Sequence, residues 1–166
     1  LNAHDITERH AAADALAREY REAETARSEM RATLDAASDA MIVVSPDGHV
    51  VTVNHAFEEV FLLREADVRG QSFERVQAIL APSFTDHAAF SAAVDAVVRG
   101  SDDGNRHVAQ RWPKHRDLDL FAAPVQDRSG VIIGRLYSFR DVTRERAVDR
   151  MKSEFVALVS HELRTP

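Results

Sequence analysis

Residues 8–38 contain neither glycine nor proline and are dense in alanine, glutamate and arginine. These three residue types favour a helix, and the two that most often interrupt one are missing. At 1.5 Å per residue, a helix over this range would be about 45 Å long. We therefore expect one long helix ahead of the globular part of the chain.

Small and apolar residues recur three and four positions apart along this helix, the spacing of a coiled coil. The seam runs through Ala13, Leu16, Tyr20, Ala23, Arg27, Met30, Leu34 and Ala37. Because most of these side chains are small and one is charged, the seam is too weak for a strong independent zipper. We interpret it as a parallel dimer helix whose register can shift at modest cost. A helix packed against the globular domain of the same chain is the alternative.

A β-hairpin is expected at the start of the globular part. The apolar residues 41–44 and the β-rich residues 49–53 flank the turn Ser45-Pro46-Asp47-Gly48. An Asp-Gly pair between two such runs is a strong hairpin signal. Both strands are rich in valine, so the pattern leaves open which side chains face inward.

Short helices are expected after the hairpin. Asn54 can cap the first of them. Its apolar residues would be Ala56, Phe57, Val60 and Phe61. Gly70 separates it from a second helix over residues 73–80, and a third is expected over 84–99 with Gly100 as its C-cap.

Three further strands are expected, over residues 106–112, 117–125 and 131–140, after a turn at 102–105. The segment 127–130 would join the last two strands. The order of two strands, several short helices and three strands predicts an α+β fold. We expect a five-stranded antiparallel sheet with the short helices on one face, flanked by long N- and C-terminal helices of the coiled-coil type.

Composition excludes several classes of function. The chain has no cysteine, which rules out disulfides, thiolate metal sites and chromophores attached through a thiol, and fits a cytoplasmic location. A net charge of −6 argues against nucleic acid as the main partner. No apolar run approaches the length of a membrane span, so we expect no membrane contact within the chain, although a longer protein can be anchored in the inner membrane upstream.

The last residues predict an amphipathic helix. Its apolar stripe comprises Val148, Met151, Phe155 and Leu158. Continuing the count places His161 at the edge of the stripe, where an imidazole can still meet a partner. Thr165 would lie one turn further on the same face, and Pro166 is expected to bend the helix.

The globular part resembles a PAS domain over roughly residues 36–143. The motifs that carry the resemblance are Ser45-Pro46-Asp47-Gly48, Asn54-His55-Ala56-Phe57 and Phe139-Arg140-Asp141-Val142-Thr143. The resemblance implies the strand order 2-1-5-4-3, a central pocket between sheet and helices, and signalling through the flanking helices. It also implies that Asp141-Val142-Thr143 ties the last strand to the outgoing helix by polar contacts. The ligand of the pocket is not indicated.

The segment Ser160-His161-Glu162-Leu163-Arg164-Thr165-Pro166, preceded by Lys152-Ser153-Glu154-Phe155, resembles the H-box of bacterial sensor histidine kinases. This resemblance implies that His161 accepts the γ-phosphoryl group of ATP and passes it to an aspartate on a response regulator. Glu162 would assist the attack, Thr165 would support the reverse phosphatase reaction, and Pro166 would bend the helix.

The two resemblances divide the chain into four parts. These are the tail of a preceding domain (1–7), a coiled-coil signalling helix (8–38), a PAS sensor domain (39–143) and the start of the dimerisation and phosphoacceptor helix (144–166). Residues 4–9 repeat the form of residues 140–145, so we interpret them as the tail of an earlier PAS domain; a chance helix cap is the alternative.

We accordingly expect a portion of a dimeric two-component histidine kinase. ATP, magnesium, the ATP-binding domain and a response regulator receiver would belong to the longer system, and we expect this portion alone to be inactive and to hold no cofactor or metal. A PAS module for ligand binding and dimerisation, with another output, is the alternative function.

Two weaker patterns remain. A mixed basic and aromatic cluster could be taken for a nucleic-acid patch. It comprises Arg106, His107, Arg111, Trp112, Lys114, His115 and Arg116. Given the overall acidity, we interpret it as a solvated rim. His87 and His107 could ligate haem or a metal only if both faced the pocket, and neither has a ligand partner at metal-site spacing on its own element.

Overall fold

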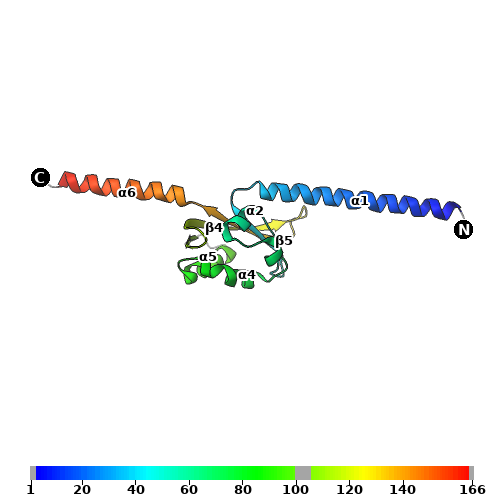
Figure 1. Ribbon diagram of the computed structural model, residues 1–166, viewed down its shortest axis with the longest axis horizontal. Helices are drawn as coiled ribbons and strands as arrows, with labels where there is room; N and C mark the ends of the chain where they lie inside the picture. Colours follow the sequence, from blue (N-terminus) through cyan, green and yellow to red (C-terminus); the bar gives the residue numbers. More distant parts are fainter. Residues whose placement is uncertain (1–2, 100–105, 165–166) are drawn as a thin grey trace. The chain divides into compact units, whose positions relative to one another are not determined.

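The computed structural model describes residues 3–99 and 106–164, with side chains described for residues 15–99 and 106–160. The chain divides into two compact units, residues 1–37 and 38–166. The first unit is helix α1 (Ala3–Asp35), coloured blue in Figure 1. The helix begins before residue 8 and ends before residue 38, so residues 3–7, which we assigned to the tail of a preceding domain, are helical as well.

The second unit contains five antiparallel strands. They are β1 (Ala40–Val44), β2 (Val50–Val53), β3 (His107–Gln110), β4 (Arg116–Gln126) and β5 (Ile132–Asp141). The strands are ordered β2-β1-β5-β4-β3. This order and the α+β class are as predicted. The turn before β2 depends on Gly48, whose φ of 83° is unfavourable for residues with a side chain.

The helices of the second unit keep the predicted order, but α3 and η1 were not predicted and the start of α5 needs a correction. They are α2 (His55–Phe61), α3 (Glu65–Val68), α4 (Phe73–Leu80), the short 3-10 helix η1 (Ala81–Ser83), α5 (His87–Arg99) and α6 (Thr143–Arg164). The prediction that a helix starts at Phe84 is wrong. Phe84 is extended and bridges to Gln110, and α5 starts only after Asp86, whose carboxylate accepts a hydrogen bond from the Ala89 amide at 2.9 Å. Gly100 and the turn at 102–105 lie outside the described residues.

Helix α2 starts where its predicted cap places it. The Asn54 side chain accepts hydrogen bonds from the backbone amides of Phe57 at 3.0 Å and Met41 at 2.8 Å. Its amide group donates to the Asp39 carbonyl at 2.9 Å. Asn54 therefore both caps α2 and holds it to the start of β1.

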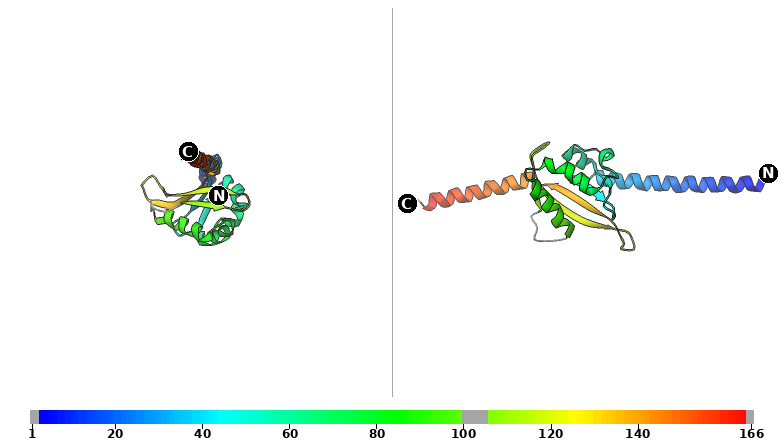
Figure 2. Two further views of the ribbon diagram at one scale, coloured as in Figure 1. Left: turned by 90° about the vertical axis from the view of Figure 1, so that its left-hand side faces the viewer. Right: turned by 90° about the horizontal axis from the view of Figure 1, so that it is seen from below.

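Phenylalanine rings fill the centre of the fold, between the sheet and the helices α4 and α5 that Figures 1 and 2 show on one face of it. The buried rings are Phe57, Phe61, Phe84, Phe90 and Phe139. Phe61 and Phe139 lie 5.0 Å apart between ring centroids, and Phe84 stacks on Phe90 at 4.2 Å. Aromatic side chains thus pack the core between the sheet and these helices.

The valine-rich pattern did not show which side chains face the core. Burial and strand register show it. Ala40, Ile42 and Val44 of β1 are buried, as are Tyr137 and Phe139 of β5. Ile42 pairs with Tyr137 and Ala40 with Phe139. The alternate residues of these strands therefore face the other side of the sheet.

Candidate functional site

The junction between β5 and α6 is the best-defined polar site in the second unit. The Asp141 carboxylate accepts hydrogen bonds from the Thr143 amide at 3.0 Å and from the Thr143 hydroxyl. The hydroxyl oxygen of Thr143 also accepts a bond from the Asp117 amide at 2.9 Å. The triplet Asp141-Val142-Thr143 thus ties the last strand to the outgoing helix by polar contacts.

Val142 adds a backbone and a packing contact to this junction. Its amide donates to the Asp117 carbonyl at 2.8 Å, and its carbonyl accepts from the Arg146 amide at 2.9 Å. Its side chain is buried. Arg116 Nε lies 3.4 Å from the Asp141 carboxylate. The first turn of α6 is therefore held against the start of β4.

A second polar contact reaches further along α6 through Asp117. The buried Asp117 carboxylate lies 3.0 Å from His107 Nε2 on β3 and 3.4 Å from both terminal nitrogens of Arg150 on α6. Burial alone would raise the pKa of Asp117, but hydrogen bonds from His107 and Arg150 outweigh it and hold the pKa below its ordinary value. Asp117 is thus a carboxylate at neutral pH that links β3, β4 and α6.

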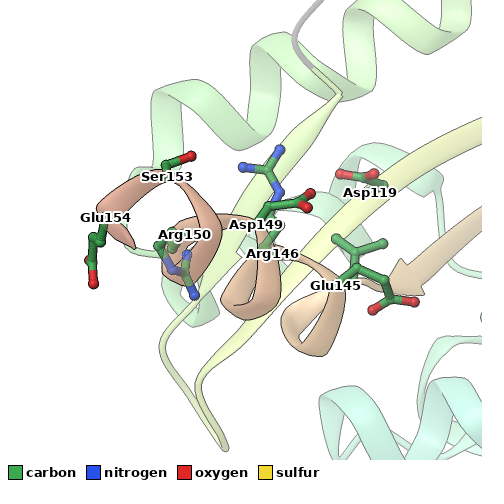
Figure 3. A pocket seen from close by; sticks show the side chains of 8 residues that line it. Asp119, Glu145, Arg146, Asp149, Arg150, Ser153 and Glu154 are labelled. Carbon is green, nitrogen blue, oxygen red and sulfur yellow. The ribbon is translucent and has the colours of Figure 1, made fainter. Parts of the chain in front are cut away.

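An open groove of about 690 Å³ runs along the first half of α6. Figure 3 shows Glu145 one turn of the helix before Asp149 and Arg150, with Asp119 on the neighbouring strand. The other lining residues are Val142, Arg146, Ser153 and Glu154. Carboxylates and guanidinium groups line the groove together, so it offers a charged polar surface.

Helix α6 continues from this junction to the predicted phosphoacceptor. His161 and Glu162 lie in its last turn, and their side chains lie outside the described part of the chain. Thr165 and Pro166 are also outside it. His161 and Glu162 thus belong to the helix that starts at the junction. Their chemical roles stay predictions.

The predicted apolar stripe of α6 is exposed within the chain. Val148, Met151, Phe155 and Leu158 expose 46%, 64%, 66% and 64% of their surface. So much exposed apolar surface on one stripe of a helix is typical of a surface that packs against another helix.

The weaker candidates have structural explanations. His107 contacts Asp117, and across the described residues no three potential ligand side chains come together in a way that could hold a metal ion. In the basic cluster, Arg111 donates to the Pro82 carbonyl at 3.3 Å, and Arg116 contacts both Gln110 and Asp141. These arginines thus have partners within the protein.

The sequence interpretation missed two buried polar residues. Asp117 was included only as the first residue of a strand. Gln110 is fully buried, with its amide donating to the Val60 carbonyl at 2.9 Å and its side-chain oxygen accepting from Arg116 at 3.2 Å. In the sequence, each of these residues is only a polar position beside apolar strand positions. Such a pattern does not show which side chain the polar residue contacts.

Comparison with known proteins identifies the family. A family model described as PAS fold matches residues 34–147, and the chain belongs to this family. A solved structure described as an RNA-binding light-oxygen-voltage receptor has the same fold. Its TM-score is 0.53 at 21% identity, and the match covers 83% of this chain and 38% of that one.

The alignments with two curated relatives are longer than the PAS region. The alginate biosynthesis sensor protein KinB of Pseudomonas aeruginosa is 30% identical over 139 residues, which cover 82% of this chain and 22% of KinB. The cell-division control histidine kinase PdhS of Brucella ovis is 26% identical over 160 residues, which cover 83% of this chain and 14% of PdhS. The chain thus spans less than a quarter of the length of either relative.

Among the helices described here, none is both long enough and apolar enough to cross a membrane.

Proposed function

We propose that this chain is the sensory and signal-transmitting part of a two-component histidine kinase, in which the PAS domain controls autophosphorylation of His161. The phosphoryl group would come from ATP, bound with magnesium by the ATP-binding domain of a longer protein. It would then pass to an aspartate on a response regulator receiver domain. Glu162 would assist the attack, and Thr165 would support the phosphatase reaction.

One observation carries this proposal: α6 runs without a break from the junction triplet to His161. From Thr143 to His161 the helix is about 27 Å long at 1.5 Å per residue. Its first turns are held to β4 through Thr143, Val142 and Arg150. A shift of the sheet would therefore move the helix that carries the histidine, and a helix pair with two packing arrangements can transmit such a shift.

The relatives support the same assignment. PdhS is named a histidine kinase and KinB a sensor protein, and both align over more than four-fifths of this chain. In the longer match, with PdhS, the alignment covers more of the chain than the PAS region of residues 34–147. For this chain, kinase control and transfer to a receiver are parts of the proposal.

The proposed active form is a parallel homodimer in the cytoplasm. The exposed stripe of α6 would pair with the same stripe of a second copy. In α1, Leu16, Tyr20 and Met30 expose 67%, 71% and 60% of their surface, and the seam they belong to would pair likewise. Small core residues would allow the register of that seam to shift.

Phosphotransfer tests the proposal. The 166-residue chain, joined to the ATP-binding domain of a histidine kinase, should acquire acid-labile phosphate from γ-labelled ATP and magnesium. His161→Ala should reduce this labelling to background, because the nucleophilic imidazole is lost. His115→Ala is the matched control, since His115 is an exposed histidine before β4, and it should keep full labelling.

Labelling that persists in the His161→Ala chain would contradict the assignment. The PAS domain would then serve as a ligand-binding and dimerisation module with another output.

A further inference from the structure

A second hollow lies at the hairpin end of the PAS domain, away from the phenylalanine-filled centre. Its volume is about 640 Å³, and its walls come from the β1–β2 turn, α4, the end of α5 and the start of β5. The apolar part of the wall includes Val44, Phe73, Val98 and Ile132. The rest of the wall is polar or charged, and a hollow of this size that combines apolar and polar side chains can hold a small molecule.

Tyr137 is a largely buried residue that lines this hollow. The residue is 6% exposed, faces the inner side of the sheet and packs on Phe73 at 4.3 Å between ring centroids. Within the described residues its hydroxyl makes no hydrogen bond, and no buried side-chain oxygen there lacks a partner, so this hydroxyl is open to solvent in the hollow. Burial raises the pKa of Tyr137, so the phenol is neutral at pH 7 and can both donate and accept.

The charges around the hollow favour a cation. Three carboxylates, those of Asp47, Glu74 and Asp95, line it together with one guanidinium group, that of Arg135. In the described part of the chain, Glu74 and Asp95 have neither an ion pair nor a hydrogen bond from their side chains. Both are therefore available to a ligand.

Asp47 and Arg135 are already engaged. Asp47 contacts His49 at 3.2 Å and accepts a hydrogen bond from the Ser45 hydroxyl. Arg135 donates to the carbonyls of Val97 and Val98 at 3.5 and 3.0 Å, at the C-terminal end of α5. The guanidinium group thus stabilises the helix end, and the net field in the hollow is negative.

We infer that this hollow binds a small organic cation, an ammonium group joined to an apolar or aromatic body. The body would lie against Phe73 and Ile132, and the ammonium group would donate to the Tyr137 hydroxyl and to the carboxylates of Glu74 and Asp95. The inference rests on the proposed function only in treating this ligand as the input of the sensor.

The test compares three ligands of one shape and different charge. The probes are 2-phenylethylammonium, the neutral 2-phenylethanol and the anionic phenylacetate, titrated into the 166-residue chain and followed by backbone amide NMR shifts. The cation should shift the amides of Gly48, Glu74 and Arg135 and bind about fivefold more tightly than the alcohol, because carboxylates at a solvent-exposed site add roughly 1 kcal/mol. Phenylacetate should bind more weakly than the alcohol.

Variants separate the contribution of the carboxylates from that of the Tyr137 hydroxyl. The double change Glu74→Gln and Asp95→Asn should reduce affinity for the cation about fivefold and leave the alcohol unchanged. Tyr137→Phe should weaken both ligands about fivefold through loss of a hydrogen bond, and it should leave the fold intact because the hydroxyl makes no hydrogen bond to the described residues. The double change Asp149→Asn and Glu154→Gln, on α6 outside the hollow, removes the same two charges and controls for the change in net charge.

Three results would overturn the inference. They are no saturable shift with the cation up to about 10 mM, equal or tighter binding of phenylacetate, and shifts confined to residues outside the hollow. None of these readouts depends on phosphorylation. A negative result in the binding test would therefore leave the proposal for His161 intact. A negative phosphotransfer result would likewise leave the hollow as a binding site.

Discussion

Asp117 connects three elements through one residue. Its carboxylate contacts His107 on β3 and Arg150 on α6, while its backbone amide and carbonyl bond to Thr143 and Val142. Because the side chain is buried, removing its charge would leave two cationic or polar partners without an acceptor. A single substitution here should therefore weaken both the sheet edge and the attachment of α6.

The first prediction concerns the stability contributed by the Asp117 charge. Asp117→Asn should lower the free energy of unfolding at pH 7 by about 2 kcal/mol, the range of a hydrogen bond to a charged group. The folded-state pKa of Asp117 is lowered, so its contribution is present above the unfolded pKa near 3.8 and is lost as pH falls through the folded value. Urea unfolding at neutral and acidic pH measures both effects.

The difference between wild type and Asp117→Asn should therefore shrink as the pH falls below about 4. Asp119→Asn is the matched control, since Asp119 lies two residues further along β4 and has no ion pair in the described part of the chain. It should change stability by less than about 0.5 kcal/mol. A constant difference between wild type and Asp117→Asn at all pH values would contradict the role of the charge.

The second prediction concerns Asn54. Asn54→Ala removes the cap of α2 and leaves the Met41 amide without its acceptor, so it should cost about 2–3 kcal/mol. Chemical denaturation measures this cost. Ser72→Ala is the control, because Ser72 caps α4 from an exposed position with a single bond of 3.3 Å. It should cost about 0.5–1 kcal/mol; equal costs for the two variants would show that the contact with β1 adds nothing.

At the level of elements, local patterns predicted most helices and strands correctly. The α4 range, the Asn54 cap and the β1–β2 turn depend on neighbouring residues, and a sequence displays such neighbours directly. The start of α5 was wrong because Phe84 forms a bridge to Gln110, a partner on another element. Apolar spacing alone cannot distinguish a helical phenylalanine from an extended one that fills the core.

The same limit applies to the candidate site. The junction triplet was predicted because its contacts are local and its pattern is shared with PAS domains. Asp117, His107 and Arg150 are distant in sequence and meet only once the sheet and α6 are in place. The hollow at Tyr137 could not be predicted, since it forms where the β1–β2 turn, α4, α5 and β5 meet, and these segments are distant in sequence.

The third prediction concerns the joint between β5 and α6. Thr143→Ala removes the acceptor of the Asp117 amide and the donor to Asp141, so amide exchange at Asp117 and Arg146 should accelerate about tenfold, equivalent to roughly 1.4 kcal/mol. Thr143→Ser keeps the hydroxyl and should restore protection. Hydrogen exchange measured by NMR distinguishes the variants. If Thr143→Ser exchanged as fast as Thr143→Ala, the methyl group and not the hydroxyl would hold the joint.

At the level of the whole molecule, the proposed function depends on how two copies associate. In the proposed dimer, an event in the PAS domain would alter His161 only if the two α6 helices adopted a defined pairing that the joint can change. Val148, Met151, Phe155 and Leu158 form the stripe that would make this pairing. Parallel, in-register packing brings each residue of the stripe close to the same residue of the second copy.

The absence of cysteine allows a direct test of this arrangement. In a parallel pair, Met151→Cys should form an intermolecular disulfide under mild oxidation, because equivalent side chains on the seam approach within the range that a disulfide needs. Ser153→Cys is the matched control, since Ser153 lies on the opposite side of the helix from the stripe and should remain reduced. Non-reducing electrophoresis measures the cross-linked fraction. Equal cross-linking at both positions would indicate random collision, and cross-linking at Ser153→Cys alone would place the interface on the groove side of α6 and contradict the proposed dimer.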